Sequence, residues 1–173
     1  MNEEVFDSSR FFLIGFMGSG KSHWGKSWAE GLGFKFIDLD EFIEHTEGLT
    51  IDQIFEVKGE SFFRQLESEA LHRVGSEKNC IIACGGGAPC FHDNMDWMNR
   101  HGVTIYLEAT PEQVLQRVAE EKDKRPLLKN IDDDDVLLFI EKKISERSKF
   151  YKQAKITIPV DQLNTNTVTN LQL

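Results

Sequence analysis

Residues 15–22 read Gly-Phe-Met-Gly-Ser-Gly-Lys-Ser, a complete Gly-x-x-x-x-Gly-Lys-Ser pattern, and they directly follow the apolar run Phe-Phe-Leu-Ile. Glycines adopt backbone angles that other residues avoid, so successive N–H groups in such a loop can curl around phosphate oxygens. The lysine adds a positive charge for the outer phosphates, and the serine hydroxyl can ligate Mg²⁺. The segment therefore predicts a loop that binds a nucleoside triphosphate with magnesium. The alternative is a glycine-rich turn with a helix-capping serine.

Along the rest of the chain, apolar runs alternate with amphipathic stretches, which is typical of a parallel sheet surrounded by helices. We expect strands at residues 10–15, 35–38, 80–83, 103–107 and 155–159. We expect helices at residues 22–32, 40–46, 51–58, 61–76, 92–100, 111–121 and 133–151. With no linker or internal repeat, the sequence predicts one α/β domain over residues 1–173.

Composition excludes several classes of function. The chain carries a formal net charge of −9, and its Lys and Arg residues are scattered, which argues against a nucleic-acid surface. No segment has the length and hydropathy of a membrane span, and the first residues are acidic where a secretion signal is basic. Cys80, Cys84 and Cys90 lack the spacing of a zinc site, so we expect buried free thiols and a cytoplasmic protein.

The predicted strand at 35–38 ends with two carboxylates. Asp38 and Asp40 are two residues apart, so continued strand alternation would place both on one side. Ligands of doubly wound sheets bind beyond the carboxyl ends of the strands, which would bring these acids close to the phosphate loop. There they could support Mg²⁺ and orient the hydroxyl of a phosphoryl acceptor. The alternative is that they only end the strand and cap the next helix.

A second glycine-rich segment follows the predicted strand at 80–83. Gly85, Gly86 and Gly87 let the backbone pass close to a small ligand and donate N–H groups to it, although a flexible turn has the same composition. Upstream, Arg64 and Glu67 have the spacing of an ordinary ion pair on a helix surface.

Arg147 is a more specific signal. It shares a helical stripe with Ile140, Ile144 and Tyr151, so its guanidinium lies on an otherwise apolar face. A cation in that position must contact an anion or extend to solvent.

Residues 119–130 are densely charged, lose the apolar periodicity and contain a proline, which predicts a mobile loop within the domain. The acidic run 132–135 is favourable at the N-terminus of a helix, and a metal site there is the weaker interpretation.

Taken together, these residues resemble the shikimate kinase family. The matching features occur in the family's order over about residues 11–158, and as a set they are highly specific. They are Gly-Phe-Met-Gly-Ser-Gly-Lys-Ser (15–22), Asp-Leu-Asp (38–40), Gly-Glu-x-x-Phe-Arg-x-x-Glu (59–67), Gly-Gly-Gly (85–87), Arg-Pro-Leu-Leu (125–128) and Arg-x-x-x-Tyr (147–151).

The resemblance implies a three-layer α/β P-loop kinase fold of the nucleoside monophosphate kinase type. Its sheet would hold five parallel strands in the order 2-3-1-4-5, with a substrate-binding helical region near 38–67 and a lid near 119–130. The implied activity is transfer of a phosphoryl group from ATP to shikimate with Mg²⁺, by a monomer that needs no nucleic acid or membrane.

The resemblance also implies a role for each matching residue. It places ATP on Gly18, Ser19, Gly20, Lys21, Ser22, His23, Arg117 and Arg125, and the metal on Ser22 and Asp38. It places shikimate on Asp40, Phe55, Phe63, Arg64, Glu67, Gly85, Gly86, Gly87 and Arg147. Lys21, Asp40 and Arg125 would be catalytic, with Asp40 as the base and Arg125 as the lid arginine that meets the transferring phosphoryl group.

Three positions depart from the family pattern. His23 stands where a threonine is usual, Lys149 replaces a proline, and Cys84 replaces a polar residue before the triple glycine. None of these changes removes a charged ligand. Two other functions remain open at this stage, namely a different small-molecule kinase of this fold, such as a gluconate or nucleotide kinase, and a nucleotide-binding module without turnover.

Overall fold

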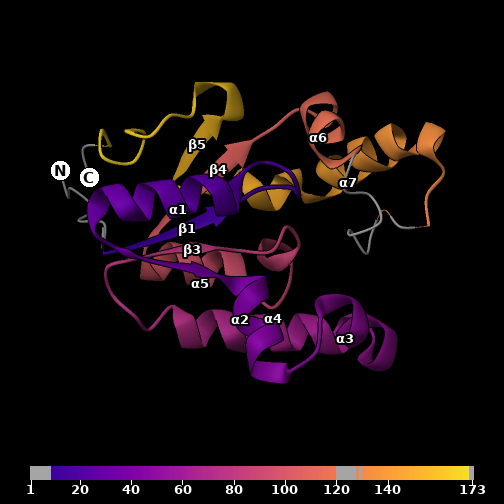
Figure 1. The fold of residues 1–173 in the computed structure, drawn as a ribbon, viewed down its shortest axis with the longest axis horizontal. Helices are drawn as coiled ribbons and strands as arrows, with labels where there is room; N and C mark the ends of the chain where they lie inside the picture. Colours follow the sequence, from indigo (N-terminus) through magenta and orange to yellow (C-terminus); the bar gives the residue numbers. More distant parts are fainter. Residues whose placement is uncertain (1–8, 120–127, 129, 172–173) are drawn as a thin grey trace.

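The computed structural model describes residues 9–119, 128 and 130–171. The described residues contain one 5-stranded sheet in the order β2-β3-β1-β4-β5, and every neighbouring pair of strands is parallel (Figure 1). The strands are β1 (Arg10–Ile14), β2 (Lys35–Asp38), β3 (Cys80–Ala83), β4 (Val103–Glu108) and β5 (Ile156–Pro159). This is the α/β arrangement that the sequence pattern predicts, in the strand order that the family resemblance implies.

Helices surround the sheet. They are α1 (Lys21–Leu32), α2 (Leu39–Glu47), α3 (Ile51–Lys58), α4 (Glu60–Val74), α5 (Asn94–His101), α6 (Pro111–Val118) and α7 (Val136–Tyr151). The first helix packs on the half of the sheet that holds β1, β2 and β3. Helices α2, α3 and α4 contact one another and form the lower part of Figure 1, and α6 packs against α7 at the other side.

The strand register places the chemically important loops at one edge of the sheet. Ala83, at the end of β3, pairs with Leu13 of β1 on one side and with Asp38 of β2 on the other. The segments that follow these strands are the phosphate loop, the start of α2 and the triple glycine. Because parallel strands end at the same edge, these three segments lie together there.

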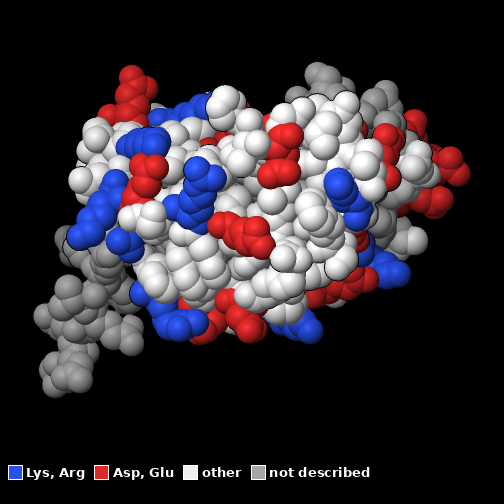
Figure 2. Space-filling model, turned by 90° about the horizontal axis from the view of Figure 1, so that it is seen from below, with Lys and Arg blue, Asp and Glu red and all other residues white. Residues whose placement is uncertain are grey.

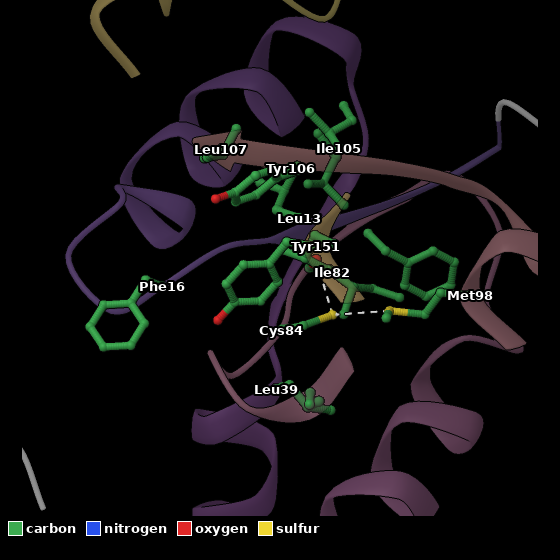
Figure 3. Close-up of a cluster of buried hydrophobic side chains, with 14 of the residues drawn as sticks. Leu13, Phe16, Leu39, Ile82, Cys84, Met98, Ile105, Tyr106, Leu107 and Tyr151 are labelled. Atoms are coloured by element: carbon green, nitrogen blue, oxygen red, sulfur yellow. Dashed lines mark hydrogen bonds between the residues drawn. The ribbon is translucent and has the colours of Figure 1, made fainter. Parts of the chain in front are cut away.

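The core centres on the inner strands β1, β3 and β4, which are buried on both faces, as is usual in a parallel sheet covered by helices. Figure 3 shows part of it, including Leu13, Ile82, Ile105 and Leu107. The thiol of Cys84 belongs to this cluster, since its Sγ lies 3.7 Å from Sδ of Met98.

All five predicted strands are confirmed to within one residue at each end. The largest errors concern helix boundaries. The helix predicted from residue 92 begins at Asn94, because His92 and Asp93 have left-handed backbone angles, with φ of 51° and 55°.

The helix predicted from residue 133 begins at Val136, and Asp133–Asp135 form a 3₁₀ turn that leads into it. The acidic run therefore lies at the start of α7, where negative charge is favourable. The helix predicted at 61–76 ends at Val74, before Gly75 and Ser76 form a turn.

The helix predicted at 111–121 ends at Val118. The predicted mobile loop at 119–130, which includes Arg125, lies mostly outside the described residues.

None of the helices in the described part of the chain is long and apolar enough to cross a bilayer. On the face seen in Figure 2, basic and acidic side chains are interspersed among uncharged ones. Cys80 and Cys84 are buried free thiols as predicted, whereas Cys90, in the 3₁₀ turn Ala88–Cys90, is only partly buried.

The packing of α1 on the sheet generates a stability prediction. A Cβ at Gly25 would lie 2.4 Å from Cε2 of Phe36 and 3.1 Å from Cδ1 of Leu13, so Gly25→Ala should destabilise the protein by about 1–3 kcal/mol. Gly31 lies on the same helix with nothing within 4 Å of its Cβ position, so Gly31→Ala should stabilise by about 0.5–1 kcal/mol. Urea unfolding of both variants tests this contrast, and equal effects would contradict it.

Candidate active site

The phosphate loop connects β1 to α1. Gly18 and Gly20 have φ angles of 75° and 95°, which side-chain-bearing residues rarely adopt. Within the described part of the chain, no side chain caps the start of α1, so its first N–H groups are available to phosphate oxygens. Nζ of Lys21 donates to the carbonyl oxygens of Gly15 and Phe16, at 2.8 and 2.9 Å, which holds the ammonium group against the loop.

Ser22 and Asp38 join the phosphate loop to the end of β2. Oγ of Ser22 donates to Oδ2 of Asp38 at 2.6 Å. Oδ1 of the same carboxylate accepts from the backbone N–H groups of Asp40 and Glu41, at 3.1 and 3.3 Å. Asp38 therefore caps α2, as the alternative interpretation expected, and its second oxygen holds the hydroxyl of the loop.

Asp40 does not continue the strand as the alternation argument assumed. The strand β2 ends at Asp38, and Asp40 lies in the first turn of α2. It still lies beside Asp38, because the helix starts where the strand ends.

Two cavities meet at Asp40. The larger, of about 540 Å³, is lined by the phosphate loop, Asp38 and Arg117, and we call it the donor cavity. The smaller, of about 120 Å³, is lined by Arg64, Arg147 and aromatic side chains, and we call it the acceptor cavity. The residues that line both are Met17, Asp40, Gly85 and Gly86.

Arg64 lies in the wall of the acceptor cavity and is only 5% exposed. Its guanidinium carbon lies 5.2 Å from the ring centre of Phe63 and 4.6 Å from that of Phe91, and Phe55 is also close, at 6.0 Å. Nη1 pairs with Oε2 of Glu67 at 2.9 Å. The interpretation of Arg64 and Glu67 as an ordinary surface pair is therefore wrong, because both side chains are buried in the cavity wall.

Arg147 enters the same cavity from α7. Its guanidinium carbon lies 5.4 Å from the ring centre of Phe16, and the side chain is partly buried. Among the described residues, no carboxylate forms an ion pair with it. One turn further along α7, the hydroxyl of Tyr151 donates to the carbonyl oxygen of Gly86 at 2.5 Å, which ties the helix to the triple glycine.

Close packing explains the triple glycine. A Cβ at Gly85 would lie 2.5 Å from Oε1 of Glu67 and 3.2 Å from Oδ1 of Asp40. A Cβ at Gly87 would lie 2.6 Å from Nη1 of Arg64. Any side chain at these two positions would displace the charged groups that line the acceptor cavity.

The same packing removes water from two carboxyl groups. Burial, reinforced by the charge of Asp38, raises the pKa of Asp40 to about 6, although Lys21 acts in the opposite direction. Burial raises the pKa of Glu67 to about 7, against the opposing effect of Arg64. Oε1 of Glu67 is buried with no hydrogen-bond partner among the described residues.

The structure brings nearly all the predicted site residues to these two cavities. Gly18, Gly20, Lys21, Ser22, His23 and Arg117 line the donor cavity, and Nη1 of Arg117 donates to the carbonyl oxygen of Gly18 at 3.0 Å. Ser19 is buried in the loop and does not line a cavity, and its Oγ has no partner among the described residues. Arg125 lies outside the described residues, so its role remains a prediction.

Sequence reasoning did not assign a role to Met17, Trp24 or Phe91. Met17 occupies a variable position of the loop pattern, and Trp24 looks like an ordinary apolar residue of α1. Phe91 is distant in sequence from Arg64, so only the fold reveals their contact. The motif Arg-x-x-x-Tyr singled out Tyr151, but it did not indicate that the hydroxyl bonds to the carbonyl oxygen of Gly86.

A parallel sheet in the order β2-β3-β1-β4-β5, with a phosphate loop between its first strand and first helix, is the arrangement of P-loop kinases. The family model described as shikimate kinase matches residues 17–172. A shikimate kinase of Bacteroides thetaiotaomicron is 42% identical over 154 residues, which cover 89% of this chain and 88% of that protein. The chain belongs to the shikimate kinase family.

Solved structures agree with this assignment. The crystal structure of the Bacteroides thetaiotaomicron shikimate kinase superposes with a TM-score of 0.85 at 42% identity, over 90% of this chain and 88% of that chain. Shikimate kinase from Acinetobacter baumannii, solved in complex with shikimate, has a TM-score of 0.80 at 35% identity, over 91% of this chain and 84% of that chain.

Burial of Asp40 generates a prediction about stability. The folded protein holds the Asp40 proton more tightly than the unfolded chain, whose pKa is near 3.8, so ionisation costs stability as the pH rises from about 4 through about 6. Asp40→Asn removes that cost and should raise the free energy of unfolding by about 1–3 kcal/mol at pH 8, with little change at pH 4.

Denaturant unfolding at the two pH values measures the effect. Glu56→Gln, which changes an exposed carboxylate on α3, is the control. In this variant the free energy of unfolding should differ between pH 4 and pH 8 by the same amount as in the parent protein. A destabilised Asp40→Asn protein at pH 8 would contradict the prediction.

Proposed function

We infer that this protein transfers the terminal phosphoryl group of ATP to a hydroxyl of shikimate. The observation that carries this function is the junction of the two cavities at Asp40. One cavity has the phosphate loop, and the other has two arginines, aromatic walls and a backbone of glycines. A nucleotide and a small hydroxylated acid bound in them would meet where Asp40 lies.

We propose that the donor cavity binds ATP through the N–H groups of the loop from Gly18 to Ser22, with Arg117 and His23 further along the cavity wall. Nζ of Lys21, now held by two loop carbonyls, would exchange these acceptors for phosphate oxygens. The ammonium charge then offsets the negative charge of the outer phosphates.

We propose Mg²⁺ as the metal, held by the hydroxyl of Ser22 with Asp38 behind it. The donor set is a hydroxyl and a carboxylate 2.6 Å apart at the phosphate loop. Hard oxygen ligands of this kind suit Mg²⁺, which takes only one or two protein ligands and completes its shell with phosphate oxygens and water. The bound ion would neutralise charge on the phosphates during transfer.

We propose that Arg64 and Arg147 bind the carboxylate of shikimate. Arg147 has a partly buried guanidinium and no carboxylate partner among the described residues, so an anionic ligand would complete its surroundings. Phe55 and Phe63 would flank the ring, and the backbone of Gly85 to Gly87 would approach it closely. A neutral sugar would leave the guanidinium of Arg147 without an anion.

Asp40 would orient the attacking hydroxyl and accept its proton. With a pKa of about 6, the carboxylate is largely ionised at neutral pH and remains basic enough to take a proton as the hydroxyl attacks. The phosphoryl group passes through a loose transition state, so the remaining task is to align donor and acceptor and to neutralise charge. Arg125 is proposed to share that task.

The family assignment disfavours a gluconate or nucleotide kinase. The arginine pair beside an aromatic wall suits a cyclic hydroxylated acid. A module without turnover would have no use for Asp40 at the junction. Since both cavities are lined by residues of one chain, a monomer suffices for the proposed reaction.

The proposed role of Asp40 predicts a loss of turnover on substitution. Asp40→Asn should lower shikimate-dependent ADP release by at least ~100-fold while ATP binding stays nearly intact, because a general base contributes about 10²–10⁴. In the parent protein, kcat/KM for shikimate should rise with pH through about 6, as Asp40 loses its proton. A variant that retains a tenth of the parent rate would refute the assignment.

The proposed role of Arg147 predicts a selective loss of acceptor affinity. Arg147→Met removes a charge-assisted contact to the carboxylate, so KM for shikimate should rise about 10- to 100-fold while KM for ATP changes little. Lys149→Met removes the same charge from an exposed position of α7 and is the control. Arg64 is a poorer test, because its removal would also leave Glu67 buried without its partner. A selective rise in KM for ATP would show that Arg147 faces the donor.

A further inference from the structure

The first turn of α1 places an indole in the wall of the donor cavity. Trp24 lines this cavity together with Lys21, Ser22 and Arg117. A Cβ placed on Gly20 would lie 3.1 Å from Cδ1 of Trp24, 3.4 Å from its Nε1 and 3.5 Å from Nη1 of Arg117. The edge of the indole that carries the N–H group and the guanidinium of Arg117 therefore lie beside the same residue of the phosphate loop.

The surrounding residues hold this indole in place. Its ring stacks on that of Trp28, with the ring centres 5.8 Å apart and the planes inclined by 23°. Trp28 is 1% exposed, and its Nε1 donates to the carbonyl oxygen of Asn164 at 2.8 Å, in the segment that follows β5. The ring of His23, an exposed residue, meets that of Trp24 at 80° with a centre distance of 5.0 Å. These contacts fix the direction in which the N–H edge points.

The indole N–H has no acceptor within the described residues, whereas the corresponding group of Trp28 is satisfied. Tryptophan can only donate, so a partner of Trp24 must offer an acceptor oxygen or nitrogen. The neighbouring guanidinium of Arg117 also only donates. Two donors of different elements, α1 and α6, thus lie beside Gly20 in the wall of the donor cavity. Neither residue lines the acceptor cavity, toward which the terminal phosphoryl group is transferred.

We propose that Nε1 of Trp24 donates a hydrogen bond to the nucleoside end of the phosphoryl donor and so helps select a nucleotide over inorganic polyphosphate. This role of Trp24 rests on the proposed function in one respect, namely that ATP is the phosphoryl donor. It assigns no chemical step to Trp24, which binds and orients the donor. It also gives the segment after β5 a role, since that segment holds Trp28 and through it Trp24.

The test compares variants that keep an aromatic ring at each position. Trp24→Phe removes the N–H group and keeps a ring against Trp28, so KM for ATP should rise about 3- to 10-fold, the loss expected for one neutral hydrogen bond, with KM for shikimate unchanged. Trp97→Phe is the control, because Trp97 packs against Phe12 and two histidines on α4 and α5.

Direct binding separates the nucleoside from the phosphates. By calorimetry, Trp24→Phe should weaken binding of ADP and leave binding of inorganic tripolyphosphate unchanged. Equal weakening of both ligands, or no weakening of either, would overturn the proposal.

A fluorescence measurement leaves Trp24 itself unchanged. In the Trp97→Phe protein, saturating ADP should change the tryptophan emission, because Trp24 lines the donor cavity, and tripolyphosphate should not. Unchanged emission with ADP would overturn the proposal. If the parent protein releases no ADP when shikimate is added, the proposed acceptor fails, but these binding experiments still decide the role of Trp24.

Discussion

The hydrogen bond of 2.6 Å between Oγ of Ser22 and Oδ2 of Asp38 joins the two parts of the chain on which the site depends. One partner is the last residue of the phosphate loop and lies in the first turn of α1, and the other ends β2 and caps α2. Since β3 separates β1 from β2 in the sheet, this bond spans the edge where the three strands end. It places the loop, the cap and Asp40 in one polar cluster at the junction of donor and acceptor cavities.

Burying the carboxyl groups of this cluster lowers the stability of the fold, and the same burial makes Asp40 a better base for the proposed reaction. The glycines at 85 and 87 let charged groups approach the backbone, and that approach excludes water from Asp40 and Glu67. Burial raises the pKa of both carboxyl groups, which lowers stability near neutral pH and makes Asp40 a better base. The aromatic rings around Arg64 and its pairing with Glu67 limit the cost, because the buried cation is neutralised within the wall.

Much of this site could be predicted from local sequence. The phosphate loop, the acids at the end of β2 and the place of Arg147 on an apolar helical stripe each carry a local pattern, whereas the spacing of Arg64 and Glu67 alone indicated a surface pair. Strand positions were also accurate, because short runs rich in apolar residues between turns leave little choice in a parallel sheet. Helix starts were less accurate, since left-handed residues such as His92 and a 3₁₀ turn such as Asp133–Asp135 produce no distinct pattern.

The sequence by itself determined the class of fold, the phosphate loop and the family, because these depend on short contiguous motifs and on periodic burial. Only the tertiary structure decided that Arg64 and Glu67 are buried, that Phe91 covers Arg64, and that Trp24 lines the donor cavity. Burial, desolvation and ring contacts arise between residues far apart in the chain, so their strength depends on packing that no local pattern encodes.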